Sequence, residues 1–290
     1  MPELPEVETI RAGLERGIVG QMIQTATVLN PKTFDVPSGV INQIVVGSTI
    51  KRIHRRAKVL MWDISNGYTL MFHLKMTGQV VLVRADGERF AGGHPSIYMA
   101  GGLPDRSTRV IFGLASGDTV YFNDQRKFGW VKLIETNQIF KDSLIKRLGP
   151  EPLSDDFTLQ GFQYVLTRHG RAPIKAVILD QSTVSGIGNI YADESLHLAK
   201  IHPQRLAGSL DPLEVKRLHK SIKTIISLGI KHGGTSFTHY LNALGGRGDY
   251  LEHARVFRRT DLMCPVCGTI IEKIRVAGRG THFCPTCQKL

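Results

Sequence analysis

The placement of its cysteines limits the fold of this chain more than any other pattern. All four lie in the last 27 of 290 residues, as Cys264-Pro-Val-Cys267 and, after a further 16 residues, Cys284-Pro-Thr-Cys287. Two such pairs supply four thiolates at the spacing of a tetrahedral zinc site, and a site closed by four cysteines leaves no coordination position for a substrate. A tail this short cannot otherwise bury enough apolar surface to fold. We therefore expect one structural zinc ion bound by the four cysteines; disulfide pairing or a redox role is the alternative.

The body of the chain has no cysteine and carries a strong excess of positive charge. Thirty-seven Lys and Arg against 25 Asp and Glu give a formal net charge of +12. This balance favours a polyanionic partner, and nucleic acid is the leading candidate. A membrane surface is the weaker alternative, because no stretch approaches the roughly 20 consecutive apolar residues of a membrane span. The acidic N-terminus lacks an apolar signal segment, and a body without cysteines suits a reducing cytosol, so we expect a cytoplasmic protein.

The first half of the chain combines one helix with many short strands. Apolar residues recur at helical spacing from Val7 to Ile18, and β-rich runs follow between about 22 and 135. Turn dipeptides such as Asn66-Gly67 separate several of the runs. The pattern predicts a β-sandwich or flattened barrel with the first helix packed against it, and residues 85–108, rich in Gly and Pro, as a surface insertion. The expected strands span 50–53, 59–64, 68–74, 79–84, 109–112, 119–122 and 130–134.

Beyond Gly149-Pro150-Glu151-Pro152 the segments become helical. Asp211 at an N-cap position, followed by Pro212, marks the clearest helix start. The expected helices span 157–167, 173–181, 189–199 and 212–231. The sequence thus predicts an α+β, multidomain chain. Its parts are an N-terminal β-sandwich domain over 1–135, a linker over 136–152, a helical domain over 153–262 and a zinc finger over 263–290.

The N-terminal residues can carry chemistry of their own. Removal of Met1, usual before a small residue, leaves Pro2 with a free secondary amine beside the carboxylate of Glu3. An α-amino group titrates near about 7.7 to 8.0, against about 10.4 for lysine, so a useful fraction is nucleophilic at neutral pH. Such an amine can form a Schiff base with a sugar carbon. The alternative is that Pro2 and Pro5 stiffen the start of a helix whose positive end favours the nearby glutamates.

The start Met-Pro-Glu-Leu-Pro-Glu-Val-Glu, taken with the four C-terminal cysteines, resembles the bacterial formamidopyrimidine-DNA glycosylase family. The resemblance runs from residue 2 to residue 288. It implies a monomeric, bifunctional DNA glycosylase and apurinic/apyrimidinic (AP) lyase of base excision repair. Such an enzyme excises 8-oxoguanine and formamidopyrimidines from duplex DNA through a Schiff base and β,δ-elimination. It further implies that Pro2 is the nucleophile, Glu3 the general acid/base and Glu6 a supporting residue.

The same resemblance assigns DNA contacts to several further residues. From their neighbours in the sequence alone, these residues could equally belong to a solvated surface or to ordinary core packing. Lys58, in Arg-Arg-Ala-Lys, and Arg279, near a basic hairpin tip, are expected to bind phosphate beside the reaction centre. A helix-two-turn-helix element would place Lys175 and Asn189 on phosphate. An enzyme that extrudes a base must fill the void left behind. The expected void-filling residues are Met76, Arg126 and Phe128, with Lys127 as a further DNA contact.

The chain also departs from the family pattern. Asp-Gln-Arg-Lys at 124–127 and Arg-Ser-Thr-Arg at 106–109 are unusual, and 257–263 lacks the usual glycines and proline. These differences affect the expected preference for lesion and opposite base more than the chemistry. The Gly-containing loop over about 235–255 is expected to cap the lesion. Two other functions stay open: an endonuclease VIII relative that prefers oxidised pyrimidines, and a zinc-finger protein that only binds DNA.

Overall fold

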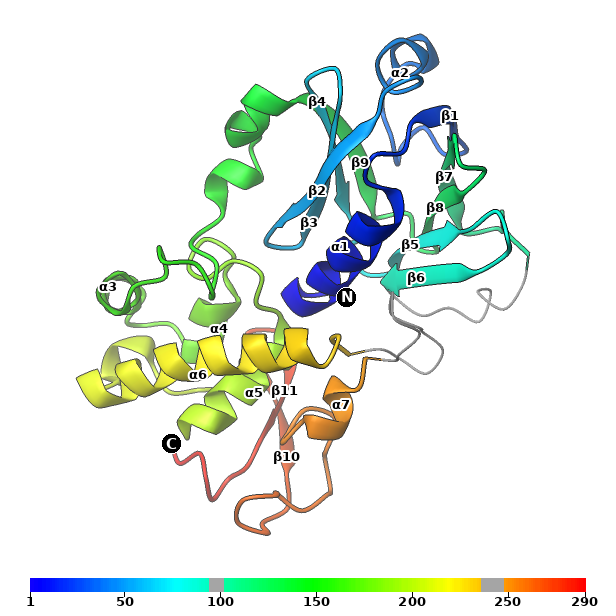
Figure 1. Ribbon diagram of the computed structural model, residues 1–290. Helices are drawn as coiled ribbons and strands as arrows, with labels where there is room; N and C mark the ends of the chain where they lie inside the picture. The colour runs from blue at the N-terminus through cyan, green and yellow to red at the C-terminus, as the bar shows by residue number, and fades with distance from the viewer. Residues whose placement is uncertain (94–101, 236–247) are drawn as a thin grey trace. The chain divides into compact units, whose positions relative to one another are not determined.

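The structure is a computed structural model that describes residues 1–93, 102–235 and 248–290. The chain divides into two compact units (Figure 1): residues 1–146 with 233–248, and residues 147–232 with 249–290. Within the described ranges, no helix combines the length and the apolar character that crossing a membrane requires.

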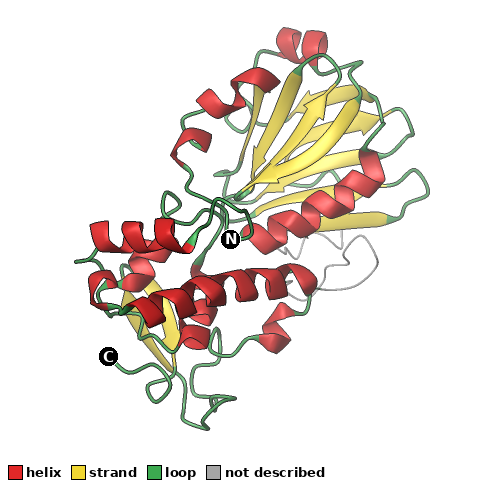
Figure 2. Ribbon diagram, turned by 60° about the vertical axis from the view of Figure 1, so that its left-hand side comes forward, coloured by secondary structure: helices red, strands yellow, loops and turns green. Residues whose placement is uncertain are grey.

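The first unit is built on two antiparallel sheets (Figure 2). The five-stranded sheet contains, in spatial order, β1 (Ile23–Val28), β7 (Thr108–Leu114), β8 (Thr119–Asp124), β5 (Gly78–Val83) and β6 (Arg89–Gly93). The four-stranded sheet contains β2 (Ile50–Arg56), β3 (Val59–Ile64), β4 (Tyr68–His73) and β9 (Trp130–Glu135). The predicted β-sandwich is confirmed, and each expected strand has its counterpart.

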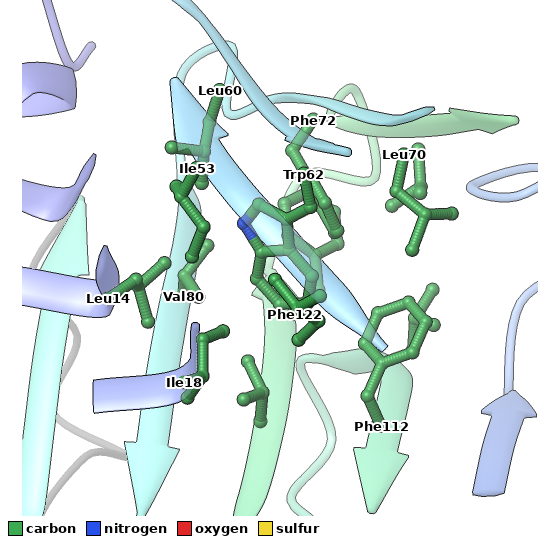
Figure 3. Packing of buried hydrophobic residues seen from close by; sticks show 14 of the residues in the cluster. Leu14, Ile18, Ile53, Leu60, Trp62, Leu70, Phe72, Val80, Phe112 and Phe122 are labelled. Carbon is green, nitrogen blue, oxygen red and sulfur yellow. The ribbon is translucent and has the colours of Figure 1, made fainter. Parts of the chain in front are cut away.

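Aromatic side chains from both sheets meet in the core of this unit (Figure 3). Trp62 and Phe72 come from the four-stranded sheet, and Phe112 and Phe122 from the five-stranded sheet. The ring centroids of Trp62 and Phe72 lie 4.6 Å apart, and those of Trp62 and Phe112 lie 5.6 Å apart. Such aromatic pairs favour tilted contacts over face-to-face stacks, so a few large rings fix the spacing of the two sheets.

Helix α1 (Leu4–Ile18) packs against the sandwich with the predicted apolar face buried. A Cβ added to Gly13 would lie 2.2 Å from Cζ of Phe90, and one added to Gly92 would lie 2.2 Å from Cγ1 of Ile10. The two glycines therefore allow α1 and β6 to approach closely. The expectation that 85–108 is a surface insertion is wrong for β6, which belongs to the sheet; residues 94–101 of that insertion lie outside the described residues.

Besides β6 and two 3₁₀ helices, β1 and the short helix α2 (Ser38–Ile44) have no counterpart among the predicted elements. In β1, Ile23 is the single buried residue, and in α2 it is Ile41. With one buried side chain each, neither element produces a periodic pattern. The 3₁₀ helices η2 (Thr136–Lys141) and η3 (Ile145–Arg147) follow β9.

The second unit contains the helices and the cysteine-rich tail. Its elements are α3 (Leu159–Arg168), α4 (Ile174–Leu179), α5 (Asn189–Ala199), η4 (Ala207–Ser209), α6 (Pro212–Lys231), α7 (Tyr250–His253), β10 (Glu272–Val276) and β11 (Arg279–Phe283). α5 and α6 have the predicted bounds, and α3 and α4 differ by one or two residues at their ends. The Asp211 side chain accepts a hydrogen bond from Glu214 N at 2.8 Å, which is the predicted N-cap of α6.

The compact units differ from the predicted division of the chain. The helical region and the cysteine-rich tail lie in one unit, whereas 233–248 is grouped with the β-sandwich. Most of the predicted capping loop, residues 236–247, lies outside the described residues. The boundaries at 135, 152 and 262 therefore stay predictions about domains, and the residues below are described within the unit to which each belongs.

Candidate active site and nucleic-acid interface

The dipeptide Pro2-Glu3 leads directly into helix α1. Glu3 is the N-cap residue, with φ of −102° and ψ of −171°, and Glu6 Oε2 accepts a hydrogen bond from Glu3 N at 2.8 Å. The two glutamates form a capping box, which fixes the path of the chain into the helix. Pro2, Glu3 and Glu6 are all buried. The structure thus brings the three N-terminal candidates together at the positive end of α1.

Glu6 also holds a segment from the far end of the chain. Its Oε1 accepts hydrogen bonds from the backbone N of Thr235 at 2.7 Å and from Thr235 Oγ1 at 3.0 Å. Gly234 has φ of +74°, and a Cβ added there would lie 2.7 Å from Glu6 Oε1. A glycine is needed at that position for both reasons. One carboxylate therefore joins the start of α1 to the start of the predicted capping loop.

Lys58 lies in the two-residue turn between β2 and β3. Arg56 pairs with Val59 across this turn, and Ala57 has φ of +50°. Lys58 is 7% exposed. Arg55 forms an ion pair with Glu8 of α1, with 2.9 Å between Nε and Oε2. The hairpin that carries Lys58 is thereby tied to the first turns of α1.

His73 ends β4 and belongs to the same neighbourhood. Its Nδ1 accepts a hydrogen bond from Lys75 N at 3.0 Å. Burial, together with the positive charges of Lys75 and Lys58, lowers the pKa of His73 to about 3. The imidazole is therefore neutral near pH 7 and acts as a fixed acceptor that shapes the turn after β4.

Asp124 organises two turns at the end of the five-stranded sheet. Its Oδ1 accepts a hydrogen bond from Thr77 Oγ1 and one from Arg126 N at 3.2 Å, and its Oδ2 accepts one from Gly129 N at 2.6 Å. Arg126 N also donates to Thr77 Oγ1 at 3.0 Å. The turn after β4 and the turn after β8 are therefore held by one carboxylate.

These two turns carry the predicted void-filling residues. Met76 is 37% exposed and Phe128 is 55% exposed, which excludes ordinary core packing for both. Arg126 Cζ lies 4.8 Å from the centre of the Phe128 ring, a cation–π contact at the surface. Lys127, between them, is exposed and has φ of +58°. The sandwich thus presents an apolar wedge, an aromatic ring and a guanidinium from a rigid base.

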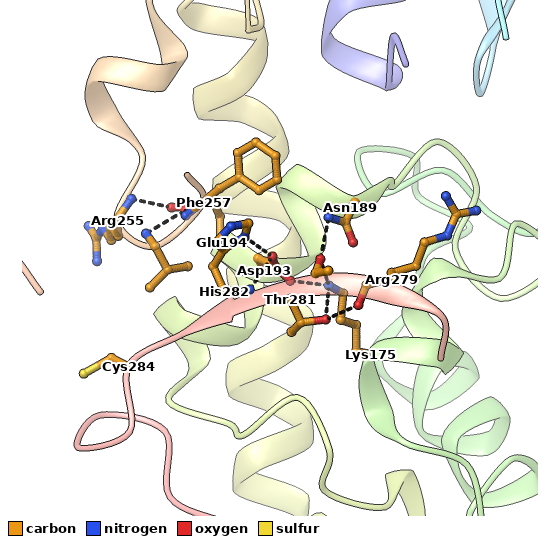
Figure 4. A network of polar contacts seen from close by, with 12 residues as sticks. Lys175, Asn189, Asp193, Glu194, Arg255, Phe257, Arg279, Thr281, His282 and Cys284 are labelled. Carbon is orange, nitrogen blue, oxygen red and sulfur yellow. Dashed lines mark hydrogen bonds and ion pairs between the residues drawn. The ribbon is translucent and has the colours of Figure 1, made fainter. Parts of the chain in front are cut away.

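In the second unit, the turn between α4 and α5 meets the tip of the C-terminal hairpin (Figure 4). Asn189 is the first residue of α5, and its Nδ2 donates a hydrogen bond to the carbonyl of Gly280 at 2.9 Å. Val276 pairs with Arg279 across the turn formed by Ala277 and Gly278, whose φ angles are +47° and +75°. Arg279 is exposed at this predicted hairpin tip.

The structure corrects the expected role of Lys175. Its side chain is fully buried, and Nζ lies 2.6 Å from Asp193 Oδ1. Nζ also donates to Thr281 Oγ1 at 2.7 Å and to the Gly280 carbonyl at 3.3 Å (Figure 4). An ammonium enclosed in this way is not available for direct contact with a phosphate at the surface. Lys175 instead positions the residues that follow Arg279.

Two neighbouring carboxylates on α5 complete this support, and the sequence marked neither. Asp193 Oδ2 accepts a hydrogen bond from His282 N at 2.9 Å. Glu194 accepts hydrogen bonds from the backbone N atoms of Arg255, Val256 and Phe257 at 2.8 to 2.9 Å. α5 therefore holds both the hairpin and the chain that leads to the first cysteine. Partners this far away in the chain leave no local pattern.

The four cysteines gather as the zinc site requires. All four Sγ atoms lie within 4.8 Å of one another, with 4.0 Å between Cys264 and Cys287 and 3.4 Å between Cys267 and Cys284. A tetrahedral site with Zn–S bonds of about 2.3 Å needs sulfur atoms roughly 3.8 Å apart. Backbone N–H groups of Val266 and Cys287 point at cysteine sulfurs, as they do toward thiolates. Disulfide bonds are absent, since all four thiols are free.

Comparisons with known proteins identify the family. Three family models match: the formamidopyrimidine-DNA glycosylase N-terminal domain over residues 1–131, the formamidopyrimidine-DNA glycosylase H2TH domain over 148–240, and a zinc finger found in FPG and IleRS over 262–290. The chain belongs to the formamidopyrimidine-DNA glycosylase family. The four-cysteine cluster is therefore a zinc finger with one structural zinc ion.

Similarity extends over the whole chain. The formamidopyrimidine-DNA glycosylase of Herpetosiphon aurantiacus is 43% identical over 99% of this chain and 100% of its own, and that of Desulforamulus reducens is 42% identical over 100% and 99%. A solved complex of a Lactococcus lactis FPG mutant with Fapy-dG containing DNA has a TM-score of 0.87 and 37% identity over 100% of both chains. Membership makes this chain a DNA glycosylase and AP lyase that acts on oxidised purines in base excision repair. An exclusively DNA-binding function is thereby set aside.

Proposed function

We propose that the Pro2 nitrogen, freed by removal of Met1, is the nucleophile of this formamidopyrimidine-DNA glycosylase. Its lone pair attacks C1′ of the damaged nucleotide, and the bond between C1′ and the base breaks with its electron pair leaving on the base. The attacked intermediate loses the N–H proton of Pro2 to solvent, and Glu3 donates a proton to the ring oxygen as the sugar opens, which leaves a positively charged Schiff base (iminium) between Pro2 and C1′. Loss of a C2′ proton then expels the 3′ phosphate, and a second elimination expels the 5′ phosphate.

The observation that carries this proposal is the double engagement of Glu6. One carboxylate oxygen accepts the N–H of Glu3 at 2.8 Å and the other accepts the N–H of Thr235 at 2.7 Å. The backbone next to the nucleophile is thus fixed before substrate arrives, and a pre-oriented nucleophile removes much of the entropic barrier to attack. Glu6 is a positioning residue in this scheme.

Phosphate binding is proposed for one group in the first unit and two in the second. Lys58 supplies a compact positive charge from a buried turn. Arg279 offers a guanidinium fork suited to two phosphate oxygens, and the Asn189 amide lies against the same hairpin. Lys175, which is buried, donates hydrogen bonds to Gly280 and Thr281, the two residues that follow Arg279. Its role is to position the hairpin.

We further assign Met76, Arg126 and Phe128 to the space that an extruded nucleotide leaves in the duplex, with Lys127 beside them on the DNA. Their exposure and the common anchor on Asp124 support this assignment. Filling the void by stacking and by contacts to the orphaned base offsets part of the cost of extrusion. The loop over about 235–255 is proposed to cap the extruded lesion, because it begins at Thr235, held by Glu6.

The proposed partner is duplex DNA that contains an oxidised purine, bound by a monomer in the cytoplasm. A Lactococcus lactis FPG mutant has been solved with Fapy-dG containing DNA, and Lactococcus lactis Fpg with DNA containing an AP site. The wild-type enzyme of that organism has also been solved with oxidised-pyrimidine containing DNA. Oxidised pyrimidines are therefore a specific second class of substrate to compare with 8-oxoguanine.

The testing experiment is borohydride trapping. The purified protein is incubated with an 8-oxoguanine:cytosine duplex and reductant, and the cross-linked peptide is mapped by mass spectrometry. An adduct on Pro2 is the expected result. An adduct that maps to another amine, or no adduct with any lesion or AP site, would overturn the assignment. Trapping with a thymine glycol duplex but not with 8-oxoguanine would move the preference to oxidised pyrimidines.

A displaced N-terminal amine provides the matched control. One glycine added before Pro2 converts the Pro2 amine into an amide nitrogen, which has no free lone pair for attack, and moves the free α-amine one residue away. This variant should lose the adduct on Pro2 and still bind a duplex that contains an uncleavable abasic analogue. Replacing Glu3 by Gln should leave Pro2 intact while slowing base release by roughly 10²- to 10⁴-fold, the usual range for a lost general acid.

A further inference from the structure

A second cluster of metal-ligating side chains lies in the second unit, away from the cysteines. His232 caps the C-terminus of α6, Asp249 precedes α7, and His253 ends α7. His232 Nδ1 lies 2.8 Å from Asp249 Oδ1, and His253 Nε2 lies 3.6 Å from Asp249 Oδ2. The two imidazole rings have their centres 3.7 Å apart. Among the described residues, only this cluster and the four cysteines bring three or more such groups within 4.8 Å.

From this geometry we infer that His232, Asp249 and His253 bind a divalent transition metal ion. Zn–N and Zn–O bonds of about 2.0 to 2.2 Å place neighbouring ligand atoms of a tetrahedral site roughly 3.3 to 3.6 Å apart. The 3.6 Å between His253 Nε2 and Asp249 Oδ2 lies in this range, and the 2.8 Å between His232 Nδ1 and Asp249 Oδ1 is a hydrogen-bond distance that lengthens when a metal ion replaces the shared proton. Two imidazoles with one carboxylate suit Zn²⁺, Co²⁺ or Ni²⁺, whereas Mg²⁺ and Ca²⁺ prefer sets of oxygen ligands. This site is additional to the structural zinc and is not required for the proposed glycosylase chemistry.

The exposure of the three side chains leaves room for further ligands. The side chain of His232 is 17% exposed, and those of Asp249 and His253 are each 43% exposed. Water can therefore complete the coordination sphere from the open side. The supporting backbone is already fixed: Asp249 N donates to the His232 carbonyl at 3.0 Å. The fully buried Tyr250 anchors α7 against Tyr191 of α5, with ring centres 5.0 Å apart.

The position of the cluster in the chain gives the metal a structural consequence. The chain leaves the second unit at His232 and returns to it at Asp249. An ion bound by His232, Asp249 and His253 would cross-link both ends of the 233–248 segment. This is the segment whose start is held by Glu6 through Thr235. The metal thus joins the two ends of the 233–248 segment, which contains the first part of the proposed capping loop.

Cobalt binding to the zinc-loaded protein tests this inference. Co²⁺ in a nitrogen and oxygen site gives visible d–d absorption without the intense near-ultraviolet charge-transfer bands of a thiolate site. The wild-type protein is expected to bind one Co²⁺ per chain while retaining its structural zinc, as measured by equilibrium dialysis and metal analysis. Replacing His253 by Ala, or His232 by Ala, should weaken this binding by at least about tenfold.

His54 supplies the matched control. His54 Nε2 lies 2.9 Å from Asp63 Oδ1, but Thr69 Oγ1 donates to the same oxygen at 2.7 Å, and this pair is not part of a three-ligand group among the described residues. Replacing His54 by Ala should leave cobalt binding unchanged. The inference would be overturned if cobalt bound only by exchange into the zinc finger. It would also be overturned if the wild-type protein and both histidine variants bound cobalt equally. Trapping on Pro2 is independent of this outcome, so the two proposals fail separately.

A second readout tests the cross-link itself. The Asp249 amide is hydrogen-bonded to the His232 carbonyl, so clamping the two residues should slow its hydrogen exchange. The expected result is slower exchange of this amide in the wild-type protein when Co²⁺ is added, and no change in the variant with Ala at 253. Unchanged exchange in the wild-type protein with the site occupied would overturn the clamping role.

Discussion

Glu6 Oε1 accepts hydrogen bonds from both the backbone N and the hydroxyl of Thr235, a residue 229 positions away in the chain. Glu6 Oε2 accepts a hydrogen bond from the backbone N of Glu3. Three donors therefore converge on one buried carboxylate. The segment that begins with Pro2, the proposed nucleophile, and the proposed capping loop share this anchor, so a change in either segment affects the other through the Glu6 side chain.

Replacing Glu6 by Gln should damage catalysis more than the fold. A Gln amide nitrogen cannot accept a hydrogen bond, so at least one buried N–H, of Glu3 or of Thr235, loses its partner, at a cost of about 1–3 kcal/mol in free energy of unfolding. Misplacement of the reacting nitrogen should slow single-turnover excision of 8-oxoguanine by about a hundredfold. Glu15→Gln, on the exposed part of the same helix, is the control and should excise at the wild-type rate. Equal rates for both variants would refute the anchoring role of Glu6.

Lys175 and Arg279 should affect DNA binding in different ways. Arg279→Ala removes the proposed phosphate contact, so the slope of log affinity against log salt concentration should fall in magnitude by about 1. Lys175→Met leaves Asp193 buried without its ion-pair partner and should lower the free energy of unfolding by about 3–5 kcal/mol. Measured at a temperature where the variant is folded, its affinity should fall with the salt slope unchanged. A reduced salt slope for Lys175→Met would instead mean that Lys175 contacts a phosphate directly.

Phe128 should matter for duplex substrates and not for stability. Its ring is 55% exposed, so Phe128→Ala should change the free energy of unfolding by less than about 0.5 kcal/mol. Loss of a stacking contact worth about 1–3 kcal/mol should slow base excision from duplex DNA by roughly 5- to 150-fold. Cleavage at an abasic site in single-stranded DNA, where no void needs filling, should stay the same. Phe140→Ala, at an 81% exposed ring of the same unit, is the matched control.

The residues that the sequence identified stand in contiguous motifs. Pro2 and Glu3 are neighbours, and each cysteine pair is separated by two residues, so their chemistry is visible before any fold is known. α5 and α6 carry strong local signals and have the predicted bounds. The β-sandwich follows from the alternation of runs and turns.

The sequence failed where a contact depends on tertiary packing. β6 contains Gly92-Gly93, and glycine has weak intrinsic β propensity, so the sequence did not indicate a strand there. Gly92 is required at its position because Ile10 occupies the space that a side chain would fill. The family resemblance placed Lys175 on phosphate, and only the packing of Asp193 against it shows that Lys175 is buried. Glu194, Asp124 and Thr235 have partners that no local pattern places nearby.

His73 should make the protein less stable in mild acid. Its pKa in the folded state is about 3, because of burial and the charges of Lys75 and Lys58, whereas an unfolded histidine titrates near 6.5. Below pH 6.5 the unfolded chain therefore binds a proton that the folded chain does not, and stability falls until the pH reaches the folded pKa. Between pH 6.5 and 5 this amounts to about 2 kcal/mol. His73→Asn keeps an acceptor for Lys75 N but cannot titrate. Urea unfolding of both proteins between pH 7 and 5 should show the steeper loss in the wild type, and parallel curves would mean that folded His73 is protonated normally.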